Sequence, residues 1–187
     1  MSVEPNGGDH ARQGRTRRVH PRSWPWRVPR ALRVLVNAVN RLGNASTLAL
    51  LSPQSGVVAT VGPHGRPQAA LVGIAATDDA EIVFDTSRNS RKFANIARLR
   101  DVALVIGWDD EVTVQLEGPA DVPTGTERER CLAAYFDQYP DGRQRAESPN
   151  ITHIRVRPRW VRYSDFRPET FGSHEFTLDW TDGVAPR

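Results

Sequence analysis

The sequence contains almost no cysteine and no long apolar run. Its single cysteine, Cys131, excludes an internal disulfide and a cysteine-based metal cluster. No apolar run approaches the roughly 18 residues of a membrane-spanning helix, and no signal-peptide core is visible. Arg17 and Arg18 form a twin arginine, but the apolar segment of an export signal does not follow them. We therefore expect a cytoplasmic protein that does not contact a membrane.

Metal ligands and acid–base groups are also scarce. None of the five histidines is spaced with carboxylates as metal ligands are, so we predict no metal site. His64 lies in an expected turn and should be exposed. His153 lies on the polar face of an expected strand, where it either lines a cleft or is a structural histidine. The pattern around Cys131, with Leu132 and Tyr135, is typical of a core helix face. No catalytic residue can be assigned.

The positive charge is concentrated at one end of the chain. Residues 1–33 hold eight arginines against two acidic residues, which gives +6. The remaining 154 residues hold 17 basic and 20 acidic residues, which gives −3. A net acidic body is a poor nucleic-acid surface. Residues 1–27 are predicted to be a disordered basic arm, and a solubilising tail or an upstream translation start explains them better than nucleic-acid binding.

The apolar patterns predict one mainly β domain with inserted helices (α+β), covering residues 28–166 and followed by a polar tail at 167–187. Pro29–Leu42 has the apolar stripe of an amphipathic helix. Six or seven short antiparallel strands connected by hairpins should close into a barrel. The expected strands are 56–61, 68–76, 81–85, 102–108, 111–118, 151–157 and 159–166, and the expected helices are 90–99 and one that Thr126 caps and that ends before Pro140.

Two of these strands carry further information. The second, 68–76, is an apolar run, which predicts burial on both faces. The fifth alternates, with Val112, Val114 and Leu116 on one face and polar side chains on the other. The polar row, which contains Thr113, Gln115 and Glu117, either lines a ligand cleft or faces water.

The start of the helix at residues 90–99 holds the only lysine of the chain, Lys92. Ser90 is a favourable N-cap, and Phe93 and Ile96 form the apolar side of the helix. Free N–H groups at a helix start, with Arg91 and Lys92 in the first turn, suit a phosphate monoester. The alternative is an ordinary solvated basic turn.

These residues together resemble a known family. The resemblance rests on Val57-Val58-Ala59-Thr60-Val61, His64-Gly65-Arg66-Pro67, Val83-Phe84, Thr86, Ser90-Arg91-Lys92, Ile96, Val102 and Trp108, and on the late run from Val156 to Tyr163. In order and spacing, residues 45–166 resemble the FMN-binding split β-barrel of the pyridoxamine 5′-phosphate oxidase family. The motif Ser-Arg-Lys opening a helix directly after the third strand is the most specific part.

The resemblance implies a homodimer with two flavin sites at its interface and a small-molecule substrate. It implies that Arg91 and Lys92, preceded by Ser90, hold the flavin phosphate. The second-strand backbone around Leu71 and Val72 would run along the flavin ring. The remaining implied contacts are Asp85 and Thr86 at the end of the third strand, and Thr113 or Gln115 on the fifth strand, usually from the other subunit.

The sequence also departs from the oxidase pattern. Ala70 and Ala75 stand where the oxidases carry an arginine and a lysine for phosphate groups, and Thr113 stands where they carry glutamine. No Arg-Leu-His-Asp-Arg signature follows Phe166. We therefore expect an FMN-dependent oxidoreductase that transfers hydride on an unknown small molecule other than a vitamin B6 phosphate. The alternatives are a reductase dependent on the deazaflavin F420 and a non-catalytic split barrel that binds flavin or haem.

Overall fold

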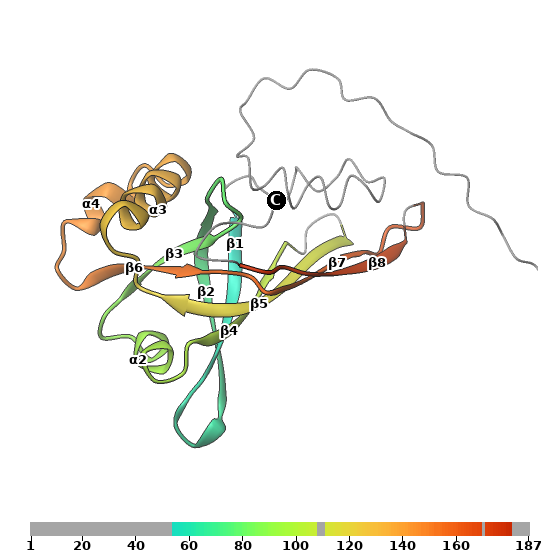
Figure 1. Ribbon diagram of the computed structural model, residues 1–187, viewed down its shortest axis with the longest axis horizontal. Helices are drawn as coiled ribbons and strands as arrows, with labels where there is room; N and C mark the ends of the chain where they lie inside the picture. The colour runs from blue at the N-terminus through green and yellow to red at the C-terminus, as the bar shows by residue number, and fades with distance from the viewer. Residues whose placement is uncertain (1–53, 108–110, 170, 181–187) are drawn as a thin grey trace, which may run out of the picture.

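The structure is a computed structural model that describes residues 54–107, 111–169 and 171–180 (Figure 1). The predicted basic arm, the predicted helix Pro29–Leu42 and Trp108 lie outside these ranges. The strands are β1 (Gln54–Val61), β2 (Pro67–Ala76), β3 (Ile82–Ser87), β4 (Asp101–Ile106), β5 (Val112–Asp121), β6 (Ile151–Val156), β7 (Trp160–Asp165) and β8 (Gly172–Thr177). The helices are the 3-10 turn η2 (Pro63–Gly65), α2 (Arg91–Arg98), α3 (Gly125–Gln138) and α4 (Gly142–Ala146).

Six strands close an antiparallel barrel, which confirms the predicted fold class. The order around the barrel is β4-β1-β2-β3-β6-β5, and pairing of β5 with β4 closes it. β7 continues from the free part of the β5 edge, and β8 pairs with β7, so these two strands project from the barrel (Figure 1). Among the described residues, no helix is long and apolar enough to span a membrane.

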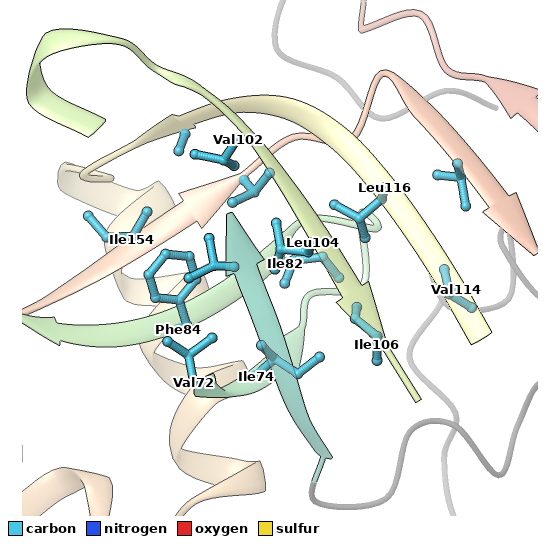
Figure 2. Packing of buried hydrophobic residues seen from close by; sticks show 14 of the residues in the cluster. Val72, Ile74, Ile82, Phe84, Val102, Leu104, Ile106, Val114, Leu116 and Ile154 are labelled. Carbon is cyan, nitrogen blue, oxygen red and sulfur yellow. The ribbon is translucent and has the colours of Figure 1, made fainter. Parts of the chain in front are cut away.

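The barrel interior is filled by alternate side chains of its strands (Figure 2). Phe84 and Ile154 are fully buried there, and Leu104 nearly so. The predicted alternation of the fifth strand is confirmed, because the even residues from Val112 to Ala120 point into this core. The second strand differs from its prediction. Only its second half is buried on both faces, and Leu71 leaves 66% of its surface exposed.

A second, smaller core joins α3 to the outside of the sheet. Cys131 and Tyr135 of α3 pack on Ala75 of β2 and Val83 of β3. Cys131 is therefore the core residue that the pattern predicts, and burial raises the pKa of its thiol to about 11. The predicted cap of this helix was wrong. The N-cap is Thr124 rather than Thr126, and its side chain makes no capping hydrogen bond.

Two predictions about irregular segments were also wrong. The segment 143–150, which lies outside the expected helices and strands and is therefore expected to be a loop, contains part of α4. The tail after Pro168 contains β8, whose residues pair with all of β7 from Trp160 to Asp165. This strand is rich in polar side chains and is held by backbone hydrogen bonds at the sheet edge, so it lacks the apolar alternation that marks a half-buried strand.

A buried ionic cluster ties α3 to the strands beneath it. Glu81, which is 0% exposed, lies within 3.3 Å of Arg155 and 2.6 Å of Arg130. Arg155 also contacts Asp121 at 2.8 Å and Glu127 of α3 at 2.9 Å. Because each charge inside the cluster has an opposite partner, the cluster avoids the cost of burying an isolated charge.

Arg155→Ala should destabilise the protein by about 3–5 kcal/mol, because Glu81 would remain buried with fewer cations around it. Urea unfolding measures this change. The matched control is Arg162→Ala, which breaks the exposed pair with Glu175 and should cost less than about 1 kcal/mol. Equal losses in the two variants would contradict the role given to the buried cluster.

Candidate functional site

The barrel opens between β2 and β3. Their pairing covers only three residue pairs, from Ile74–Phe84 to Ala76–Ile82. β2 remains paired with β1 back to Pro67, and β3 remains paired with β6 as far as Ser87. Within the described residues, the edge of β2 from Pro67 to Gly73 that faces β3 therefore has no strand partner. We call this stretch the open edge.

The open edge offers backbone hydrogen-bonding groups. The N–H of Ile74 does not donate to a neighbouring strand; it donates to the hydroxyl of Tyr139 at 3.1 Å. Backbone groups of a strand point alternately to its two sides, so Val72 and Ala70 present their amide and carbonyl groups on the same side as Ile74. An unpaired strand edge is a template for a planar ligand or another backbone.

Tyr139 lies at the end of the open edge that is formed by Gly73. It is the residue directly after α3, and its ring lies against Gly73. A Cβ atom on Gly73 would lie 3.0 Å from the Tyr139 ring, so only glycine fits beneath this tyrosine without a shift. Burial raises the pKa of the Tyr139 phenol, which therefore stays protonated near neutral pH.

The start of α2 lies across the gap from the open edge. Thr86, buried at the end of β3, and the N-cap Ser90 place their hydroxyl oxygens 2.9 Å apart. The Ser90 hydroxyl accepts the N–H of Phe93 at 3.2 Å, which confirms the predicted cap. The N–H groups of Arg91 and Lys92 have no acceptor in the part of the chain that the structure describes, so they remain available to an anion.

The cations at this helix start have no carboxylate partner in the described part of the chain. Arg91 is exposed and Lys92 is half-buried, and neither forms an ion pair with any carboxylate among residues 54–107, 111–169 and 171–180. Arg88 also lies here, with its guanidinium 5.7 Å from the centre of the Phe93 ring. Three cations, two N–H groups without an acceptor in the described residues and the two hydroxyls thus lie at one helix start.

α2 is fixed against the tip of the β1–β2 hairpin. The side-chain amide of Asn95 donates at 2.9 Å to Thr60 of β1 and at 2.9 Å to Gln68 of β2. Arg98 donates to the main-chain oxygens of Val61 and Gly62. These contacts tie the second half of α2 to the hairpin, and so position α2 relative to the open edge.

The structure does not bring Asp85 to this helix start. Asp85 and Thr86 point to opposite faces of β3, as successive strand residues do. The Asp85 carboxylate lies on the outer face, where it accepts a hydrogen bond from Arg145 of α4 at 3.1 Å. Any contact between Asp85 and a ligand in the gap would therefore use its backbone rather than its carboxylate.

Thr113 and Gln115 lie on the outer face of the barrel, away from the open edge of the same chain. The registers place Leu71, Val57, Val105 and Gln115 in one row across β2, β1, β4 and β5. Three strand spacings of about 4.8 Å separate Gln115 from Leu71 by about 14 Å. A second copy of the chain would have to supply Gln115 to a ligand at the open edge.

Tyr139, Asn95 and Arg145 were not predicted from the sequence as residues of the site. Tyr139 is marked in the sequence only by its place between a helix and Pro140-Asp141-Gly142. Asn95 contacts residues 27 and 35 positions away, and Arg145 contacts one 60 positions away, so no local pattern reveals them. No group of three potential metal-ligating side chains is placed to hold a metal ion in the described residues.

Fold and site together define a six-stranded split barrel with unpaired cations at the helix start beside the split. The sequence profile of the family described as pyridoxamine 5′-phosphate oxidase matches residues 45–165. Because the match covers more than half of the chain, this protein belongs to the pyridoxamine 5′-phosphate oxidase family.

Curated relatives agree with this placement. A pyridoxine/pyridoxamine 5′-phosphate oxidase of Thermosynechococcus vestitus is 35% identical over 102 residues, which cover 54% of this chain and 46% of that protein. One from Burkholderia vietnamiensis is 36% identical over 86 residues, which cover 46% and 40% respectively. The chain thus spans less than half of the length of each of these relatives.

Solved structures share the fold at lower identity. The structure of a heme binding protein from Mycobacterium smegmatis superposes with a TM-score of 0.60 at 20% identity and covers 69% of this chain and 54% of that one. A pyridoxamine 5′-phosphate oxidase-related, FMN binding protein from Nostoc punctiforme superposes with a TM-score of 0.52 at 16% identity, over 87% and 94% of the two chains. These identities establish the shared fold alone.

The helix start yields a stability prediction. Ser90→Ala should lower the unfolding free energy by about 1 kcal/mol, because α2 loses its capping hydrogen bond. Arg91→Ala and Lys92→Ala should each change it by less than about 0.5 kcal/mol, because these cations have no carboxylate partner among the residues that the structure describes. Urea denaturation of the three variants measures the differences. Large losses in the lysine and arginine variants would mean that these cations serve stability.

Proposed function

We propose that this protein is a flavin-dependent oxidoreductase that binds FMN in the split between β2 and β3. The proposal rests mainly on Arg91 and Lys92, which lack carboxylate partners among the described residues and lie at a capped helix start across from the open edge. A flavin mononucleotide has a phosphate monoester at one end and a planar ring at the other, and the site offers a matching feature for each.

The residues present fit the cofactor. The phosphate would be held by Arg91, Lys92 and the free N–H groups of the first helical turn, with the hydroxyls of Ser90 and Thr86 beside it. The ring would lie along the open edge, where the backbone of Ala70 and Val72 supplies donors and acceptors. Tyr139 and Gly73 would limit how far the ring extends toward α3.

When bound, a flavin supplies hydride transfer and can return its electrons to oxygen or another acceptor. The protein contributes binding and position. Lys92 and Arg91 fix the phosphate, and the unit formed by α2 and the β1–β2 hairpin fixes the distance between the phosphate and the open edge. We assign no general acid or base among the residues that the structure describes.

The same geometry argues against a vitamin B6 phosphate as substrate. Ala75 is buried beneath α3 against Tyr135 and Cys131, so this position has no space for a cation that reaches a ligand. Ala70 likewise provides no charge at the open edge. The substrate we infer is a small molecule without a phosphate group at these positions, and F420 is the cofactor to test beside FMN.

Lys92→Ala should weaken FMN binding by about one to two orders of magnitude, because a charge-assisted phosphate contact contributes about 1.5–3 kcal/mol. Quenching of flavin fluorescence during titration measures the affinity. Arg100→Ala is the matched control, since it removes one exposed positive charge close to the end of α2 and should leave the affinity within about twofold. Equal affinities of the lysine variant and the parent would refute the phosphate assignment.

We further propose that a second copy of the chain covers the outer face around Leu71 and completes the site. Leu71 is 66% exposed, and its row neighbours Val57 and Val105 are half-buried. A contiguous apolar face of this kind is typical of an interface. A copy docked there would bring its own Thr113 or Gln115 toward the ring, whereas Thr113 and Gln115 of the first copy lie too far from that ring.

Leu71→Asp should convert the proposed dimer to a monomer, because a carboxylate would be desolvated in the apolar interface. Light scattering after size-exclusion chromatography gives the mass. The control is Phe171→Asp, which changes another exposed hydrophobic residue outside this row and should leave the mass unchanged. A monomeric parent protein, or a dimeric Leu71 variant, would contradict the proposed interface.

A further inference from the structure

His153 occupies an unusual position between the sheet and the helical layer. It lies on the outer face of β6, is 7% exposed, and is covered by α3. The rings of Tyr135 and Phe136 meet it edge-on, with centroids 4.8 and 5.6 Å away. Its Nε2 atom is buried and has no hydrogen-bond partner in the described part of the chain. A buried polar atom without a partner is uncommon and calls for an explanation.

We propose that His153 is an acid-sensitive latch that holds α3 and α4 against the sheet while it is neutral and loosens them when it is protonated. The latch acts on the candidate site through Tyr139. This tyrosine follows α3 directly, binds the N–H of Ile74 and lies against Gly73 at the limit of the open edge.

The charges around His153 do not favour a cation there. On β3, the Asp85 carboxylate is already paired with Arg145 of α4. On α3, Tyr135 is protonated and Arg128 is positive, and on α4 the guanidinium of Arg143 lies over the Phe136 ring. On β6 itself, Arg155 is already paired with Glu81, Asp121 and Glu127. Imidazolium formation would therefore add a positive charge to a layer whose nearest carboxylate is already paired.

The direction of the pH effect follows from burial. Burial lowers the pKa of His153 below its ordinary value, with Arg128 and Arg145 acting in the same direction and Asp85 opposing them. His153 therefore binds its proton more tightly when α3 and α4 have moved away from the sheet than when they are packed against it. Lowering the pH through the ordinary histidine pKa of about 6.5 therefore favours opening. The equilibrium constant for opening rises by up to about tenfold per pH unit.

Hydrogen–deuterium exchange of the full-length protein, corrected for intrinsic rates, tests the latch. Between pH 7.5 and pH 5.5, peptides from residues 125–146 should lose protection by up to about tenfold relative to peptides from the barrel strands. In His153→Phe this loss should be absent, and His153→Gln serves as a second variant if the phenylalanine does not fit. His64→Gln, at the exposed hairpin turn, should respond as the parent protein does.

Two results would overturn the proposal. One is an unchanged exchange of residues 125–146 in the parent protein between the two pH values. The other is the same loss of protection in the two His153 variants. Neither result depends on flavin, so failure of the latch is distinguishable from failure of the proposed function.

The link from the latch to ligand binding rests on the proposed function. FMN affinity should fall more in the parent protein than in His153→Phe over the same pH interval. The phosphate of FMN itself titrates near pH 6, so both proteins lose some affinity, and the difference between them is the contribution of His153. Equal losses of FMN affinity in the two proteins would show that protonation of His153 does not affect the candidate site.

Discussion

The short pairing between β2 and β3 is the constraint on which the rest of the structure depends. Three residue pairs hold these strands together, and beyond Ile74 they diverge. The divergence leaves an unpaired edge on β2 and places the end of β3, with the turn into α2, opposite that edge. A fully paired barrel would have no such gap, and the helix start would face solvent alone. The site is thus a consequence of strand pairing that stops early.

Positive side chains occur in two different environments in this structure. Around Arg155, arginines pair with carboxylates, with Arg155 and Glu81 themselves buried, and these pairs fasten α3 to the sheet. At the start of α2, Arg91 and Lys92 are left without carboxylates in the described structure. Charges that serve stability are normally paired when they are held in place. Lack of a partner alone does not mark a site, but the place of these two cations, at a capped helix start across from the open edge, supports the anion site that we propose.

The sequence predicts the barrel and the helix start well, because both depend on local patterns. The alternation of the fifth strand and the cap at Ser90 are properties of neighbouring residues, and the structure confirms them. Strand β8 escaped prediction because its residues are mostly polar, and Asp85 was assigned without its distant partner Arg145. The open edge and Tyr139 depend on pairing between strands and on contacts 65 residues apart, which no local pattern records.

The visible absorption spectrum of the purified full-length protein, with mass spectrometry of the molecules that heat releases from it, tests the central claim most directly. We expect the two-band spectrum of a flavin and the mass of FMN. A single deazaflavin band would contradict the FMN assignment and favour F420. A colourless protein that also takes up neither added FMN nor F420 would contradict the whole assignment of the split as a flavin site.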